Sequence, residues 1–269
     1  KLIWQSVYTH ISLWLWFLPS QSYSHQTIAT SSGLQWLTSV QQADGSWGDR
    51  FAPIMRETTA AAEVFHLLDK TSPSYAAALQ WLMTAGSSNT DYVSRRLYVF
   101  SKTSNDFSID LNYLLSGRKS DGGWGLDSEH ESGIINTTLS LLALKSANYT
   151  DSTVITNAIS YLLSNQNADG GFGFYTGDVS NVYMTALVSS TLQQFQQTTS
   201  IATAVNKATT YLLAHQNTDG GFGSSPSTVY ETALSVIALI QSGQGQAPPL
   251  QNAIAYLTSA QLPNGSWND

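Results

Sequence analysis

A short polar segment, which we call the joint, recurs along this chain at the spacing of a helical hairpin. It reads QQADGSWG at 41–48, RKSDGGWG at 118–125, NQNADGGFG at 165–173, HQNTDGGFG at 215–223 and QLPNGSW at 261–267. Eleven positions before the joint aromatic stands another aromatic residue, and a degenerate second copy brings the total to six: Trp36, Trp81, Tyr113, Tyr161, Tyr211 and Tyr256. These lie 45, 32, 48, 50 and 45 residues apart, which indicates two helices per repeat.

The two helices of a repeat differ in pattern. The segment NAISYLLSNQ at 157–166 has apolar residues at helical spacing with polar residues between them, which predicts an outer helix with one face in water. The segments at 136–146 and 229–242 are apolar or small nearly all round, which predicts inner helices buried on most sides. We expect inner helices at about 55–69, 90–102, 130–147, 180–197 and 228–242.

The joints connect an outer helix to an inner one. Asp or Asn followed by Gly supplies the left-handed backbone conformation that ends a helix. The aromatic side chain that follows packs inside the turn. A phosphate-binding loop would need a preceding strand and a following Lys, and this pattern has neither. The residues assigned to this structural repeat are Gln41, Asp44, Gly45, Trp47, Asp121, Gly122, Trp124, Asp169, Gly170, Phe172, Asp219, Gly220, Phe222, Gly265 and Trp267.

The predicted fold class is all-α. Closing six helical-hairpin repeats into an α/α toroid buries every inner helix without special caps. Only five inner helices are visible, so either residues 3–18 supply the sixth or the chain is a fragment that lacks the last inner helix. Residues 27–269 form the predicted toroid domain.

Composition removes several classes of function. The net charge is −7 with eleven scattered basic residues, which argues against a nucleic-acid partner. The chain has no cysteine, so disulfides and thiolate chemistry are excluded. The apolar stretch at 11–18 is far shorter than the roughly 20 residues of a transmembrane helix.

Residues 1–24 carry two alternative interpretations. Small residues at Ser22 and Ser24 fit signal-peptide cleavage after Ser24, which would make the protein secreted or periplasmic. Alternatively, this segment is a helix that closes the ring, an interpretation favoured by its three tryptophans. Asn136, Asn148 and Asn264 stand in Asn-x-Ser/Thr triplets.

The pattern formed by Gln41, Asp44, Gly45 and Trp47 resembles the QW repeat of squalene cyclases and the repeats of protein prenyltransferase β subunits. The resemblance covers about 27–269 and implies the toroid fold shared by terpene cyclases, prenyltransferases, cobalamin carriers and thioester domains. It does not specify an activity, because one fold serves many functions.

The resemblance also implies where catalytic groups would stand. Squalene-type cyclases protonate their substrate with an Asp-x-Asp-Asp motif that runs into Thr-Ala at an inner helix. Alignment puts the last Asp at Glu57, Asn136, Met184 and Glu231, and the proton donor at Arg56, Ile135, Tyr183 and Tyr230. The second copy, with Ser94, Arg95 and Arg96, offers no acid either. The zinc of protein prenyltransferases needs a cysteine, which is absent.

The sequence therefore predicts a non-catalytic toroid that binds an unidentified small molecule or protein and needs no cofactor. The mouth where inner helices begin is the predicted site, lined by Arg56, Glu57, Tyr183, Tyr230 and Glu231, and its helix dipoles favour an anionic or polar ligand. The alternative is a terpene cyclase-like enzyme with Glu57 or Glu231 as an atypical acid. A polysaccharide-acting α/α barrel is a third possibility.

Other polar residues have simpler interpretations. Glu57 and Glu231 also suit the N-terminal ends of helices, where negative charge is favourable. Asp127, Glu129, His130 and Glu131 form the densest acidic cluster, which we interpret as a solvated loop in preference to a calcium site. Arg56, Arg95 and Arg96 are interpreted as ion-pairing residues in preference to an anion site.

Overall fold

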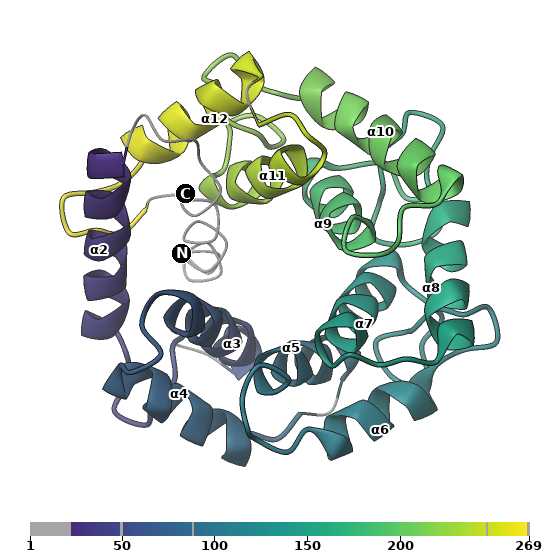
Figure 1. The fold of residues 1–269 in the computed structure, drawn as a ribbon, viewed down its shortest axis with the longest axis horizontal. Helices are drawn as coiled ribbons and strands as arrows, with labels where there is room; N and C mark the ends of the chain where they lie inside the picture. Colours follow the sequence, from purple (N-terminus) through teal and green to yellow (C-terminus); the bar gives the residue numbers. More distant parts are fainter. Residues whose placement is uncertain (1–22, 49–50, 88, 246, 268–269) are drawn as a thin grey trace. The chain divides into compact units, whose positions relative to one another are not determined.

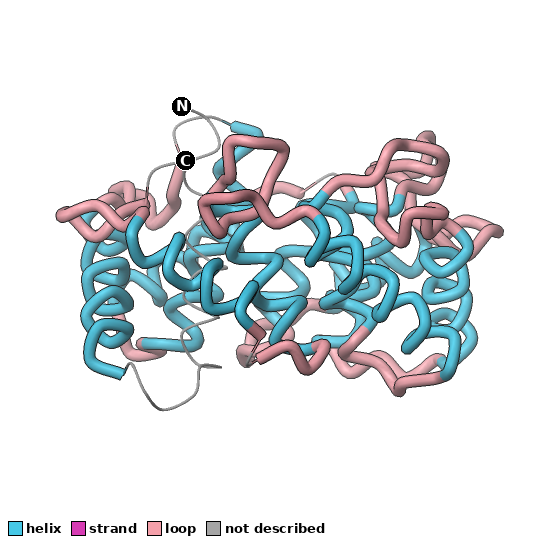
Figure 2. Tube along the Cα trace, turned by 90° about the horizontal axis from the view of Figure 1, so that it is seen from above, coloured by secondary structure: helices cyan, strands magenta, loops and turns pink. Residues whose placement is uncertain are grey.

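The computed structural model describes residues 23–48, 51–87, 89–245 and 247–267. Within these ranges the chain forms eleven helices and no strand, so the predicted all-α class is confirmed (Figure 2). No helix in the described ranges is both long and apolar enough to cross a membrane. The chain divides into two compact units.

Unit 1 combines the two ends of the chain, up to Gly86 and from Gln216 onward. Its helices are α2 (Tyr23–Ser39), α3 (Phe51–Leu68), α4 (Pro73–Thr84), α11 (Val229–Gln241) and α12 (Pro248–Ser259). Unit 2 is the continuous segment 87–215. Its helices are α5 (Thr90–Phe100), α6 (Ser108–Gly117), α7 (Ile134–Ser146), α8 (Ser152–Ser164), α9 (Val182–Leu192) and α10 (Thr199–Ala214).

The helices of unit 2 form two layers, as the repeat pattern predicts. Helices α5, α7 and α9 lie in one layer, and α6, α8 and α10 cover it (Figure 1). In α7 nine of the 13 residues are buried, whereas in α8 only Val154, Ala158, Tyr161 and Leu162 are. The nearly uniform apolar pattern of an inner helix and the one-sided pattern of an outer helix are both explained by this difference.

The joints are turns, as predicted. In NQNADGGFG the Asp169 carboxylate accepts the backbone N–H of Gly171 at 2.9 Å, and Gly170 has φ +86°. A Cβ atom on Gly170 would lie only 2.7 Å from the carbonyl oxygen of Lys207 in α10. Glycine is therefore required twice, for its positive φ and for the close approach of the next outer helix.

The glutamine of the joint ties each repeat to the next. The Gln166 amide donates to the carbonyl oxygens of Gly170 (2.9 Å) and Ala204 (2.8 Å), which joins the turn to α10. The same pair of bonds occurs at three further joints, in which Gln41 reaches Ser74, Gln216 reaches Pro249 and Gln261 reaches Ala29. This glutamine therefore has a structural role in every joint that contains it.

A threonine of the following inner helix accepts a hydrogen bond from the backbone N–H of the joint aromatic. The backbone N–H of Phe172 donates to Thr185 Oγ1 at 2.9 Å, and the ring is completely buried. The equivalent bonds join Trp47 to Thr58, Trp124 to Thr137 and Phe222 to Thr232. Where the aromatic is tryptophan, its indole N–H also donates to an outer-helix carbonyl, as in Trp267 to Leu257 (2.8 Å).

The first and last repeats lie side by side within unit 1. Gln261 donates to the carbonyl of Ala29 in α2 at 2.9 Å, and a Cβ on Gly265 would lie 2.2 Å from the Ser32 carbonyl oxygen. The two predictions for residues 1–24, a signal peptide or a ring-closing helix, fall outside the described residues except for the start of α2 at Tyr23. Among the described residues no inner helix follows α12.

Candidate functional site

The caps of the inner helices define their register. The side chains of Asn89, Asn181 and Thr228 each accept the backbone N–H three residues further on, at the starts of α5, α9 and α11. The residues three positions after the cap are therefore equivalent: Tyr92, Met184 and Glu231. One position earlier stand Asp91, Tyr183 and Tyr230.

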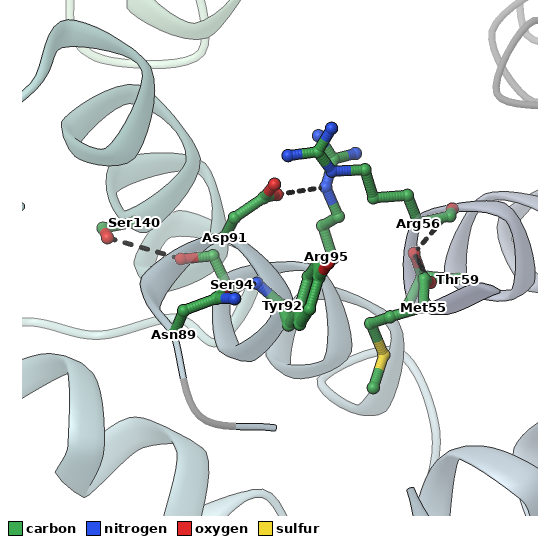
Figure 3. Close-up of polar contacts among 9 residues, drawn as sticks. All are labelled: Met55, Arg56, Thr59, Asn89, Asp91, Tyr92, Ser94, Arg95 and Ser140. Carbon is green, nitrogen blue, oxygen red and sulfur yellow. Dashed lines mark hydrogen bonds and ion pairs between the residues drawn. The ribbon is translucent and has the colours of Figure 1, made fainter. Parts of the chain in front are cut away.

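This register corrects the sequence alignment of the second copy. Asp91 occupies the position at which the family motif places its proton donor, where the alignment found no acid. Asp91 is 3% exposed, and its Oδ1 lies 2.5 Å from Arg95 Nε one helical turn away (Figure 3). The ion pair and the N-terminal end of α5 both stabilise the charged carboxylate.

Arg96 is also paired. Its Nε donates to Asp110 Oδ2 at 2.8 Å and its Nη2 to Asp110 Oδ1 at 2.6 Å, which joins α5 to α6 by two parallel bonds. Ser94 faces a different helix, since its hydroxyl lies 3.3 Å from that of Ser140, between α5 and α7 (Figure 3). The pairing interpretation of Arg95 and Arg96 is therefore confirmed.

Glu57 is not at a helix start, contrary to the sequence prediction. Because α3 begins at Phe51, Glu57 lies in its second turn, where it is 5% exposed. Its Oε2 would lie 2.5 Å from a Cβ on Gly48, the glycine that follows the joint aromatic. The neighbouring Arg56 is exposed.

Glu231 does lie at the start of α11, as predicted. Its backbone N–H donates to Thr228 Oγ1 at 3.1 Å, and the same hydroxyl donates to Glu231 Oε2 at 3.0 Å. Its Oε2 would lie 2.7 Å from a Cβ on Gly223, which repeats the relation between Glu57 and Gly48. Both glutamates therefore pack against a joint glycine, and Tyr230 beside Glu231 is half-buried.

Two loops of unit 2 meet at the N-terminal ends of α5 and α7. The carbonyl of Leu126 accepts the Thr90 N–H at 2.8 Å, and the carbonyl of Phe174 accepts the Ile134 N–H at 2.9 Å. Tyr175 lies against the N-cap residue of α7, because a Cβ on Gly133 would lie 3.0 Å from its ring. We refer to residues 126–131 and 174–179 together as the loop surface.

The loop surface is apolar and acidic at once. Its exposed large hydrophobic residues are Leu126 (38%), Phe174 (39%), Tyr175 (52%) and Val179 (86%). Phe174 stacks on the predicted mouth residue Tyr183 with 5.7 Å between ring centroids. Four carboxylates share the same loops, on Asp127, Glu129, Glu131 and Asp178.

Charge at the loop surface is negative. Two hydrogen bonds lower the pKa of the Asp127 carboxyl. The larger effect comes from His130 (2.7 Å) and the smaller from the backbone N–H of Glu129. Within the described part of the chain, no group of three or more His, Asp or Glu side chains is arranged to hold a metal ion. The first N–H groups of α5 and α7, on Thr90 and Ile134, donate to loop carbonyls, so these two donors do not face a ligand.

Comparison with solved structures finds the same fold in proteins of different activity. A variant of the type II terpene cyclase MstE from Scytonema is 16% identical, with 92% of this chain and 82% of that chain covered and a TM-score of 0.73. The ent-copalyl diphosphate synthase from Streptomyces platensis is 20% identical, with 91% and 46% covered and a TM-score of 0.59. A possible GH105 family member from Salmonella enterica is 12% identical, with 88% and 82% covered and a TM-score of 0.63.

Sequence comparisons identify the family. No curated protein matches the chain. A family model described as prenyltransferase alpha-alpha toroid domain matches residues 5–94, which agrees with the toroid class predicted from the repeats. A second model, described as squalene-hopene cyclase C-terminal domain, matches residues 132–269, more than half of the chain. The chain therefore belongs to the squalene-hopene cyclase C-terminal domain family.

Proposed function

We propose that this protein is a non-catalytic member of its family that binds a protein partner through the loop surface. The observation that carries the proposal is the pairing of Asp91 with Arg95 at 2.5 Å. A cyclase acid must carry a proton to donate it to an alkene, whereas an arginine beside a carboxylate favours the charged form. The residue in the proton donor's register is thus held in the wrong state for that reaction.

The two glutamates support the same conclusion. Glu231 accepts a hydrogen bond from Thr228 at a helix N-terminus, which stabilises its carboxylate. Glu57 lies in the second turn of α3, but its Oε2 contacts the glycine after the joint aromatic, Gly48, as that of Glu231 contacts Gly223. Their common geometry indicates a role in holding the joint to its inner helix.

The loop surface supports binding of a partner. Exposed aromatic and aliphatic residues on adjoining loops are typical of recognition surfaces, and aromatic rings also attract cationic groups. The four surrounding carboxylates favour positive charge. We therefore infer a protein partner that presents lysine or arginine together with apolar side chains.

A cyclisation assay tests the absence of catalysis. Purified protein is incubated with squalene and, separately, with geranylgeranyl diphosphate, and the extracts are analysed by gas chromatography and mass spectrometry. We expect no cyclised product. A product made by the wild type and by Asp106→Asn, an exposed control, but not by Asp91→Asn, would overturn the proposal.

A binding assay tests the loop surface. The probe is a fluorescent synthetic peptide of alternating lysine and leucine, titrated in low and high salt. We expect Glu129→Gln with Glu131→Gln to weaken binding about 2- to 30-fold, since exposed ion pairs contribute about 0.2–1 kcal/mol each. Val179→Ser should also weaken it, while Ile109→Ser, at an exposed residue of α6, should not. Equal effects of the two serine variants would refute the assigned surface.

One observation favours an enzyme as the second candidate. Asp91 is buried and stands in the register of the family's proton donor, so removal of Arg95 from its carboxylate would leave an acid at that place. Arg95→Met separates the two candidates. Cyclised product that appears only in this variant would show that the ion pair suppresses catalysis, whereas no product in either protein supports the binding role.

A further inference from the structure

The structure distinguishes three asparagines that the sequence leaves equivalent. Asn136, Asn148 and Asn264 each stand two residues before a Ser or Thr, in the triplet that accepts N-linked oligosaccharide. The oligosaccharide is bulky and hydrophilic, so the acceptor amide must lie at the surface of the folded chain, and the hydroxyl residue must be accessible with it.

Two of the three do not meet this requirement. Asn136 is 3% exposed in the first turn of α7, where an attached sugar would have no space. The side chain of Asn264 is part of the last joint, because its Oδ1 accepts the N–H of Ser266 at 3.0 Å and its hydroxyl at 2.7 Å. Ser266 itself is only 6% exposed.

Asn148 has the opposite environment. It follows the C-terminal end of α7, and both Asn148 and Thr150 are exposed. Its φ is +53°, its N–H donates to the Lys145 carbonyl at 3.1 Å, and the next N–H, of Tyr149, donates to Leu144 at 3.0 Å. These bonds end α7 in a turn that needs one residue in the left-handed conformation, and Asn148 is that residue. Among the described residues no hydrogen bond engages its side chain.

We propose that Asn148 is an N-glycosylation site of this protein. The donor is an oligosaccharide linked to a lipid diphosphate. Nδ2 of Asn148 forms a bond to C1 of the first sugar, the C1–O bond breaks with its electron pair on the departing lipid diphosphate, and one Nδ2 proton is released. The proposal requires passage through a compartment that holds this donor, which agrees with the expected secretion of the chain.

The position of Asn148 is compatible with a partner at the loop surface. The loop surface adjoins the N-terminal end of α7 and Asn148 follows the C-terminal end of this 13-residue helix. At 1.5 Å per residue, the helix separates the two places by about 20 Å. A glycan on Asn148 therefore leaves the loop surface accessible, and the glycosylation test does not depend on any binding result.

The experiment uses the full chain, secreted from cultured eukaryotic cells behind a cleavable signal sequence. Occupancy at each asparagine is read by peptide mass spectrometry, after enzymatic glycan removal in heavy-oxygen water converts modified Asn to labelled Asp. We expect a glycan on Asn148 and none on Asn136 or Asn264 in the folded fraction. Asn148→Gly, which suits the positive φ, and Thr150→Val should each abolish the mass difference on deglycosylation.

The controls make the outcome decisive. Asn264→Asp removes a triplet while keeping the acceptor for Ser266, and it should leave the glycan mass unchanged. Folding of every variant is checked by its thermal melt. Folded wild-type protein that carries no glycan on Asn148, secreted by cells that glycosylate a co-expressed control protein, overturns the proposal. A glycan on Asn136 or Asn264 in folded protein overturns the burial argument behind it.

Discussion

Gly170 of a joint and Gly177 of the loop surface allow two effects of a substitution, backbone strain and steric clash, to be measured separately. Both have positive φ, +86° and +83°, and both lie in unit 2. A Cβ on Gly170 would lie 2.7 Å from the Lys207 carbonyl oxygen, whereas a Cβ on Gly177 would meet no atom within 4 Å. Replacing each by alanine therefore imposes the same backbone strain, and only one variant adds a steric clash.

The expected magnitudes follow from these contacts. A left-handed conformation costs a non-glycine residue about 1–2 kcal/mol, so Gly177→Ala should lower the free energy of unfolding by about that amount. Overpacking against backbone adds about 1–3 kcal/mol, so Gly170→Ala should lose about 2–5 kcal/mol in all. For a chain of this size each kcal/mol corresponds to about 2–4 °C in Tm.

Thermal unfolding followed by circular dichroism, together with urea titration, measures both variants against the wild type. A larger loss for Gly170→Ala is the expected result. Equal losses in the two variants would show that α10 does not approach the turn at Lys207. No loss in either variant would refute the positive φ of the joint itself.

Three further changes test the joints and the start of the chain. Thr185→Val removes the acceptor of the buried Phe172 N–H and should cost about 1–3 kcal/mol in urea unfolding, whereas Thr203→Val on the exposed face of α10 should cost little. The Ser46 hydroxyl and then its N–H lower the pKa of Asp44 from 3.8, so the stability they provide is lost as pH falls through that lowered pKa. Asp44→Asn should keep the turn and reduce this acid sensitivity, as measured by Tm between pH 2 and 7. Mass spectrometry of exported protein should find His25 first if residues 1–24 are a signal, and Lys1 if they close the ring.

The results that would contradict these expectations are equally specific. An unchanged unfolding curve for Thr185→Val would mean that the Phe172 N–H has another acceptor. A large loss of stability in Asp44→Asn at pH 7 would contradict its equivalence to Asn264, whose Oδ1 makes the same two bonds to Ser266.

The joints could be predicted from the sequence because their chemistry is local. Asp169 and Gly170 adjoin the residues that they turn, so their types and spacing carry the information. The partner of the joint glutamine is different, since Gln41 reaches Ser74 across 33 residues. Sequence periodicity shows that such a glutamine recurs, but only the packing of the next outer helix identifies its acceptor.

The candidate site was less predictable than the fold. The second repeat has Thr90 where other joints have glycine, so the sequence predicts its inner helix at 90–102 but not the register of Asp91 within it. The signal was present in Asn89, which caps α5 as Asn181 caps α9 and thereby places Asp91 in register. The predicted start of this inner helix at about residue 55 is four residues later than the start of α3 at Phe51, and Pro53 is compatible with the first turn of a helix.

The division of the chain into units has a consequence for its synthesis. Unit 2 is continuous and complete once His215 has left the ribosome, so it can fold while the rest is being translated. Unit 1 must wait, because α2 needs Gln261 and Gly265 beside it. During this interval α2, α3 and α4 exist without their final neighbours. Nascent chains stalled before residue 261 should carry a protease-resistant unit 2 behind a protease-sensitive N-terminal segment.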